Sequence, residues 1–188
     1  MLVMKSEQIA LVFCALLSAL AYPAAAAPAC DVKATVPDGA RVFAKLSGDS
    51  PWHEYRTLES VPEPTGAGLT YAQYWLDKDG APSAFMLEMD QDYSKYVRYC
   101  FSSGNQLESI GFVVTTTWGW GYKMDGTVMQ GALQVESSGF FNTYSFDTIP
   151  RPDGASAHAD ALNLALYLET SKLPFAALLS QPSTSNPK

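Results

Sequence analysis

The alternation of apolar and polar residues between Leu69 and Phe146 constrains the fold of this chain more than any other feature of its sequence. Short runs rich in aromatic and β-branched residues follow one another there, separated by polar segments that contain aspartate, serine or glycine. A period of two residues places successive side chains on opposite faces of a strand. The region therefore predicts a series of antiparallel strands joined by tight turns, with few helices.

The segment from Tyr93 to Phe101 carries this alternation most clearly. Val97 and Tyr99 fall on one face of it, and Cys100 falls on the other. Because several segments have one polar face, an antiparallel sheet packed on one side is favoured over a parallel sheet covered on both. The predicted strands are Arg41 to Leu46, Trp52 to Leu58, a segment from Leu69, Ala84 to Met89, Tyr93 to Phe101, Leu107 to Thr117, Thr127 to Glu136 and a segment from Phe140. The predicted turns include residues 77–80, 90–92, 102–105, 124–126 and 137–139.

The pattern changes after Pro150, where the period lengthens from two residues to about 3.6. An amphipathic helix is predicted there from the apolar stripe formed by Ala161, Leu164, Ala165 and Leu168. The fold class predicted for the chain is mainly β with an α+β character. It consists of an antiparallel meander that forms a strongly curved sheet, half-barrel or barrel, followed by this C-terminal helix.

The first residues have the composition of an export signal. Lys5 precedes an apolar run from Ile9 to Leu20, and small residues follow from Ala24 to Ala29. We expect residues 1–26 to be a cleaved signal peptide, residues 27–180 a single β-rich domain, and residues 181–188 a disordered tail. The protein would then be periplasmic or extracellular. A retained anchor helix is one alternative, and another is cleavage after Ala29, which would make Cys30 the first residue and open it to lipid modification.

The cysteines support a disulfide in the exported protein. Cys14 leaves with the signal peptide, and Cys30 and Cys100 remain in a compartment that is oxidising. A bridge between them would restrict the unfolded chain by about 4 kcal/mol in the chain-entropy model. A reactive Cys100 is the alternative, but neither His53 nor His158 is near it in sequence.

The charge balance argues against a nucleic-acid partner. The 188 residues carry 19 acidic and 12 basic side chains, which gives a net charge of −7 that repels phosphate. No later stretch reaches the about 20 apolar residues of a membrane-spanning helix, so the mature chain is expected to lack a transmembrane segment. Lys95, Arg98 and Lys123 fall in or near the meander, where solvated strand faces explain them without a ligand.

The string Trp118-Gly119-Trp120-Gly121-Tyr122 is the most distinctive in the sequence. If it is extended, Trp118, Trp120 and Tyr122 project from one face and the glycines leave the other face bare. These three residues are the predicted ligand-binding residues, because such rings can stack on a sugar or an apolar molecule. The alternative is a row of core rings in which the glycines allow a sharply curved strand or the close approach of another backbone.

Two acidic pairs, Asp77 with Asp79 and Asp90 with Asp92, occupy successive predicted turns. Such pairs can contribute to a calcium site or to the acid and base of a glycoside hydrolase. Asx turns explain them more simply, because an aspartate side chain accepts hydrogen bonds from nearby backbone N–H groups.

No other motif assigns chemistry to the chain. His53 and His158 are isolated and lack metal-ligand spacing, and the sequence has no nucleophile elbow and no phosphate-binding glycine motif. We therefore predict no metal site, no cofactor and no identified catalytic residue.

The sequence favours a non-enzymatic exported binding module for a small apolar or carbohydrate ligand. Its ligand would lie in a cleft between the curved sheet and the C-terminal helix. Two alternatives remain. The first is a cell-envelope module that binds a protein partner through an exposed sheet edge. The second is a carbohydrate-active hydrolase that uses paired carboxylates.

Overall fold

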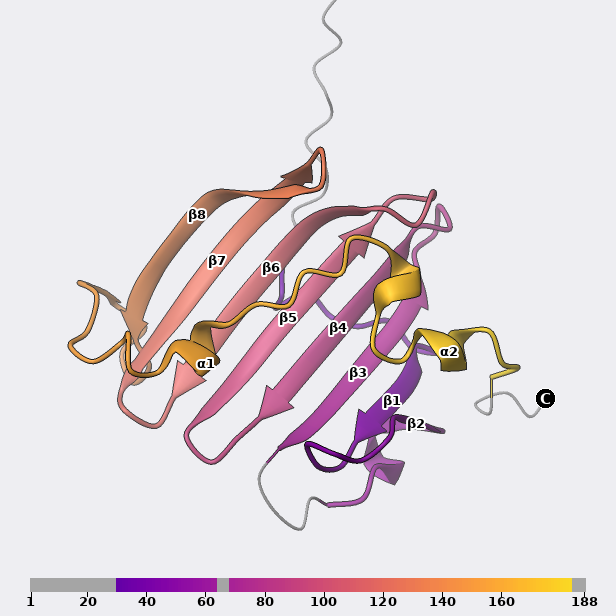
Figure 1. Cartoon of the computed structure of the whole chain (residues 1–188), viewed down its shortest axis with the longest axis horizontal. Helices are drawn as coiled ribbons and strands as arrows, with labels where there is room; N and C mark the ends of the chain where they lie inside the picture. Colours follow the sequence, from indigo (N-terminus) through magenta and orange to yellow (C-terminus); the bar gives the residue numbers. More distant parts are fainter. Residues whose placement is uncertain (1–29, 64–67, 184–188) are drawn as a thin grey trace, which may run out of the picture.

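A single antiparallel sheet dominates the computed structural model, which describes residues 30–63 and 68–183 (Figure 1). The strand order is β2-β1-β3-β4-β5-β6-β7-β8-β9, so the mainly β fold class and the meander are confirmed. The sheet is open, with β2 and β9 at its two edges. The strands are β1 Arg41–Lys45, β2 His53–Tyr55, β3 Leu69–Leu76, β4 Pro82–Met89, β5 Tyr93–Phe101, β6 Leu107–Thr116, β7 Trp120–Met129, β8 Ala132–Asn142 and β9 Thr148–Ile149.

Several predictions fall outside the part of the chain that the structure describes. They are the signal peptide at residues 1–26 with Cys14, the last residues of the predicted tail, 184–188, and most of the loop between Pro62 and Gly68. None of the helices within residues 30–63 and 68–183 has the length and hydropathy needed to cross a bilayer.

The strands β7 and β8 differ from the prediction in where they turn. The predicted turn at residues 124–126 lies inside β7, where the register shifts between Asp125 and Gly126. A β-carbon on Gly126 would lie 2.8 Å from the carbonyl oxygen of Gln134, so this glycine permits a bulge and not a turn. The hairpin turns instead at Gln130 and Gly131, whose φ angles are 53° and 78°. Two successive positive φ angles are those of a type I′ turn.

The predicted C-terminal helix is wrong beyond its first turn. Helix α1, Ala159–Leu162, ends after four residues, and the chain then runs extended to a 3-10 turn, η2, at Thr170–Lys172. The N–H of Leu107 donates to the carbonyl oxygen of Leu168 at 2.9 Å. Because that carbonyl is bonded to the sheet and a helix this short is marginal on its own, tertiary pairing overrides the helical pattern. The remaining short elements are η1, Leu58–Ser60, and α2, Ala176–Leu179.

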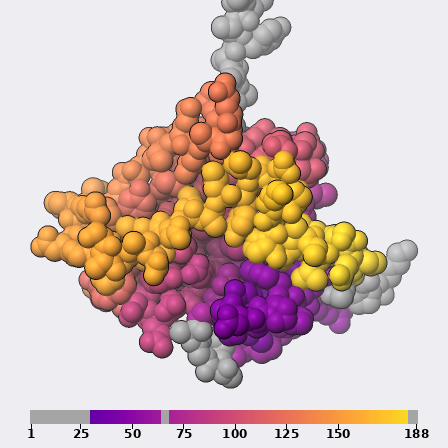
Figure 2. All heavy atoms as spheres, viewed as in Figure 1, coloured from indigo at the N-terminus to yellow at the C-terminus, as the bar shows by residue number. Residues whose placement is uncertain are grey.

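Residues 150–183, called here the C-terminal segment, cross one face of the sheet from β8 to β1 (Figure 1). We call this side the front face. Figure 2 shows the segment as a continuous band that leaves strand atoms visible beside it. The main core lies beneath it, where the rings of Phe43 and Phe175 stack with centroids 4.6 Å apart. The segment therefore supplies the second layer that an apolar sheet face requires.

The N-terminal segment, residues 30–40, packs on the opposite or back face. A disulfide joins Cys30 to Cys100 and confirms the predicted pairing. The guanidinium of Arg98 donates to the carbonyl oxygens of Asp31 and Ala34 at 3.1 and 3.0 Å. As expected from the alternation, Cys100 points away from the main core.

A substitution at Gly111 on β6 tests this placement of the N-terminal segment. A β-carbon at Gly111 would overlap the carbonyl oxygen of Cys30, which belongs to the backbone and cannot turn aside. We expect Gly111→Ala to lower the free energy of unfolding by about 1–3 kcal/mol, as overpacking does. Gly139→Ala is the matched control, since a β-carbon there meets nothing within 4 Å. Urea denaturation measures both variants, and equal stabilities would contradict the packing described.

Candidate functional site

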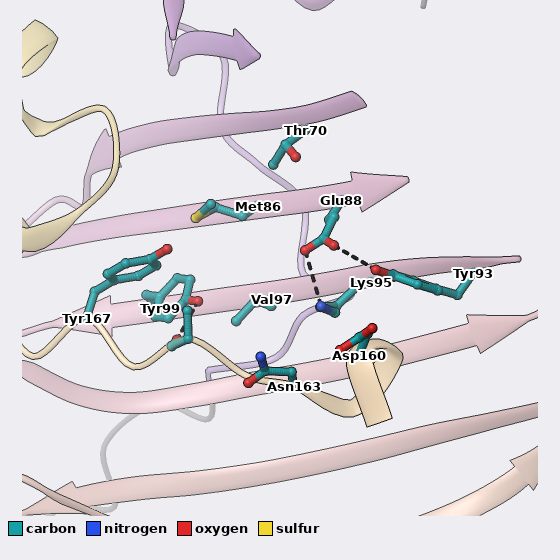
Figure 3. Close-up of a pocket in the computed structure, with 11 residues that line it drawn as sticks. Thr70, Met86, Glu88, Tyr93, Lys95, Val97, Tyr99, Asp160, Asn163 and Tyr167 are labelled. Carbon is teal, nitrogen blue, oxygen red and sulfur yellow. Dashed lines mark hydrogen bonds and ion pairs between the residues drawn. The ribbon is translucent and has the colours of Figure 1, made fainter. Parts of the chain in front are cut away.

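A cavity of about 400 Å³ lies on the front face between strands β3 to β5 and the C-terminal segment (Figure 3). This volume lies within the usual range for small-molecule sites. Its lining is mixed, with polar groups and tyrosine rings around a smaller apolar patch. The polar side chains are those of Thr70, Glu88, Lys95, Asp160 and Asn163, and the rings belong to Tyr93, Tyr99 and Tyr167.

The register of the sheet brings the central charged pair of this cavity together. Glu88 on β4 lies opposite Lys95 on β5, and Thr70 on β3 lies opposite Glu88. The Lys95 Nζ atom is 3.2 Å from Glu88 Oε2. The hydroxyl of Tyr93 donates to Glu88 Oε1 at 2.8 Å. Both carboxylate oxygens of Glu88 are therefore held by neighbours on β5.

Lys95 is the least ordinary residue of the cavity, because only 7% of its surface is exposed. Two residues further along β5 on the same face, Val97 belongs to the main core. An ammonium is costly to bury unless it is paired, and it carries three N–H donors. Within residues 30–63 and 68–183, Glu88 is the one hydrogen-bond acceptor of this ammonium, so two donors remain for a bound molecule.

The opposite wall comes from α1 and the residues just after it. Asp160 and Asn163 line the cavity there, and Thr70 lines it from β3 (Figure 3). In the described part of the chain, these three side chains make no hydrogen bond to protein atoms. The cavity thus presents free acceptors and donors on two sides.

All three tyrosines of the cavity have raised pKa values, and burial is the first cause in each. Burial, together with the hydrogen bond to Glu88, raises the pKa of Tyr93 well above its ordinary value. Burial is the main cause of the raised pKa of Tyr99. The Tyr99 hydroxyl donates to the carbonyl oxygen of Ala165 at 2.9 Å, and its ring packs 5.4 Å from that of Tyr167. Tyr99 therefore holds the C-terminal segment over the cavity.

The three predicted ligand-binding rings lie elsewhere. Trp118 occupies the β6–β7 turn, where its ring stacks on His158 with centroids 3.5 Å apart. Trp120 begins β7 and is 4% exposed, whereas Tyr122 is half-buried and its ring lies 6.2 Å from that of Phe112. The rings of Trp118 and Trp120 lie 5.9 Å apart, and those of Trp120 and Tyr122 both pack on Phe140. None of the three lines the 400 Å³ cavity, and ligand binding by them stays a prediction.

The glycines of the same string receive aromatic side chains from the next hairpin. A β-carbon on Gly121 would overlap the ring of Phe141, and one on Gly119 would lie 3.1 Å from the ring of Tyr144. The alternative interpretation of these glycines expected another backbone to approach them, and the structure differs from it. Side-chain rings approach them rather than backbone.

The turn aspartates serve local structure. Asp77 Oδ1 accepts hydrogen bonds from the N–H groups of Asp79 and Ala81, both at 2.8 Å. Asp90 Oδ1 accepts one from the N–H of Gln91 at 2.6 Å. The contact of Asp77 with Asp79 is that of an Asx turn, and the contact of Asp90 with Gln91 is likewise local. Across the described ranges, His, Cys, Asp and Glu do not gather in any group of three or more that could hold a metal ion.

Sequence reasoning placed Lys95 on a solvated strand face, and this is wrong. Lys95 has the same parity as Val97 and Tyr99, so the alternation that assigns those two residues to the core assigns Lys95 to it as well. A charged residue within an apolar row was thus the available signal. Asp160 and Asn163 had no such signal, because their place depends on how the C-terminal segment crosses the sheet.

The pKa of Tyr99 predicts how stability depends on pH. In the unfolded chain this tyrosine ionises near pH 10, whereas in the fold its raised pKa keeps it protonated. Unfolding above about pH 10 thus releases a proton, and the free energy of unfolding falls as pH rises. The variant Tyr99→Phe lacks the hydrogen bond to Ala165, so its free energy of unfolding should be about 1 kcal/mol lower at neutral pH. Between pH 9 and 11 that free energy should fall less steeply with pH than it does in the wild type.

Urea denaturation at pH 7, 9 and 11 measures this difference. Tyr144→Phe is the control, because Tyr144 is 78% exposed. Equal slopes in the two variants would contradict the assignment to Tyr99.

Comparison with known proteins adds no assignment. No protein-family model, no curated protein and no solved structure matches this chain. The sheet by itself does not specify an activity, since one fold hosts many functions. The functional conclusion therefore rests on the geometry of the cavity.

Proposed function

We propose that this protein is an exported, non-enzymatic binding module whose front cavity takes a small, neutral, hydroxyl-rich ligand of sugar size. The observation that carries the proposal is Lys95, a residue only 7% exposed beside a cavity of about 400 Å³, whose ammonium has two unused N–H donors. A structural side chain at this position of the apolar face would be expected to be apolar. The disulfide is compatible with export into an oxidising compartment.

The chemistry of the lining favours a sugar over other small ligands. Sugar hydroxyls both donate and accept hydrogen bonds, and the cavity offers carboxylates at Glu88 and Asp160, donors at Lys95 and an amide at Asn163. Tyrosine rings add flat apolar surface against which a pyranose can pack. The charges of Glu88, Asp160 and Lys95 sum to −2 + 1 = −1, which disfavours an anionic ligand.

Lys95→Met tests the proposal, because it removes the ammonium and keeps the volume of the side chain. Isothermal titration calorimetry with glucose, galactose, mannose and maltose should detect binding to the wild-type protein, and glucuronate should bind more weakly than glucose. A hydrogen bond from a charged group is worth about 1.5–3 kcal/mol, so the variant should lose about tenfold or more in affinity.

The stability of Lys95→Met separates binding from folding. Glu88 is 39% exposed in its side chain and keeps its bond to Tyr93, so the free energy of unfolding should change by less than about 1 kcal/mol. Lys45→Met on β1, outside the cavity, is the matched control and should bind as the wild type does. The proposal fails if no neutral sugar binds the wild type, or if Lys95→Met binds equally well.

Hydrolysis is less favoured than binding. Glu88 and Asp160 are the carboxylates that line the cavity, but both oxygens of Glu88 already bond to Tyr93 and Lys95. A glycoside hydrolase needs a free acid and a free base on opposite sides of the bond it cleaves. Release of reducing sugar from maltose in the calorimetry samples would favour the hydrolase.

An uncovered strand edge favours a second candidate, the envelope interaction module. β9 pairs only with Phe140 and Phe141 of β8, so within the described residues the outer edge of Ala132–Gly139 has no strand partner. Val135 on this edge is 53% exposed. Unpaired edges of this kind accept an added strand. The first partner to test is a second copy of the chain, because two antiparallel β8 edges form a closed two-fold pair.

Sedimentation at rising protein concentration tests this pairing. The wild type should dimerise, and Val135→Lys should stay monomeric because edge lysines block strand addition. Val128→Lys is not a suitable control, since Val128 packs on the core. Lys78→Glu in the β3–β4 turn places a charge change away from the edge and should dimerise normally. A monomeric wild type at every concentration excludes a second copy as the partner.

A further inference from the structure

A second hollow, of about 810 Å³, lies on the back face and is separated from the front cavity by the sheet. It is bounded by the N-terminal segment on one side and by β8 and the β8–β9 turn on the other. We call it the back groove. Its apolar lining includes Val32, Phe85, Tyr96, Val113, Phe141 and Phe146. A groove of this size and composition is typical of a site for an apolar small molecule.

Phe146 is held at the edge of the back groove in an unfavourable backbone conformation. Its φ is 61°, in the left-handed region where a bulky residue is an outlier, and 72% of its surface is exposed. The turn fixes this conformation, because the N–H of Phe146 donates to the carbonyl oxygen of Asn142 at 2.8 Å. A strained position that presents a large apolar ring to solvent contributes little to folding and suits contact with a ligand.

Phe141 extends this apolar wall toward the sheet. Its ring stacks on that of Phe146, with centroids 6.2 Å apart and an angle of 16° between the planes. The same ring lies over Gly121, where a β-carbon would overlap it. Gly121 therefore makes room for Phe141, and the two phenylalanine rings form one continuous wall.

The charges of the back groove are those of Lys33, Lys123 and Asp125, which sum to 2 − 1 = +1 in a chain of net charge −7. Lys123 pairs with Asp125 at 3.1 Å. The ammonium of Lys33 has no ion-pair partner in the described ranges, so it remains available to an anion. Charge complementarity thus favours an anionic group over a cationic one at this end of the groove.

We propose that the back groove binds an amphiphile with a single acyl chain and a carboxylate head. The chain lies along Phe85, Phe141 and Phe146, and the carboxylate meets Lys33. This site is independent of the front cavity, since it lies on the other face and shares none of its lining residues.

Two probes of equal chain length test the proposal, dodecanoate and dodecyltrimethylammonium, titrated calorimetrically below their micelle concentrations. Dodecanoate should bind more tightly by about tenfold. Lys33→Glu should lower the affinity for dodecanoate and raise that for the cation. Equal affinities of the two probes for the wild type, or no binding of dodecanoate, would overturn the proposal.

Phe146→Gly separates ligand contact from folding. Glycine adopts a φ of 61° without strain, so the thermal midpoint should be retained or raised while dodecanoate binding weakens about tenfold. Tyr144→Ala is the matched control, because Tyr144 is 78% exposed in the same turn but does not line the groove. Unchanged dodecanoate binding by Phe146→Gly would overturn the proposal. Sugar binding at the front cavity should be unaffected in every one of these variants, so failure of one site is distinguishable from failure of the other.

Discussion

The pairing of the C-terminal segment with the sheet is the constraint on which the rest of the structure depends. An open sheet with an apolar face must bury that face against a second layer, and here the layer is largely extended chain rather than helices. The Tyr99 hydroxyl and the N–H of Leu107 bond to carbonyl oxygens of this segment, and Phe175 stacks on Phe43. Without these contacts the front cavity would have a floor but no opposite wall.

The alternation in the sequence predicts the strands well because it reports burial on one face, which is a local property. β5 begins and ends where the pattern of Tyr93 to Phe101 places it. The prediction of a C-terminal helix failed because the apolar spacing there is ambiguous. It fits a helix, but leucine also recurs at every second position from Leu162 to Leu168, as in a strand. Hydrogen bonds to distant strands select the extended conformation, and no local sequence pattern contains that information.

The candidate site also combines residues that the sequence could predict with residues that it could not. Lys95 could be predicted as a front-face residue from strand parity, although its charge led to the opposite assignment. Parity does not assign Glu88 to that face, because Phe85, Leu87 and Met89 make the other face of β4 the more apolar one. The string from Trp118 to Tyr122 shows the complementary problem. Its aromatic residues attract attention, but their rings pack on His158, Phe140 and Phe112 and do not line the front cavity. The glycines have the more specific task, because each makes room for a ring from the following hairpin.

Adjacent residues of β5 fasten the two outer segments of the described chain on opposite sides of the sheet. Tyr99 bonds to Ala165 in front, and Cys100 is bridged to Cys30 behind, across a sequence separation of 70 residues. During synthesis the thiol of Cys30 thus has to wait for β5 to emerge before it meets its partner. Neither cover can be fastened by these contacts before β5 is in place, because Tyr99 and Cys100 both belong to that strand.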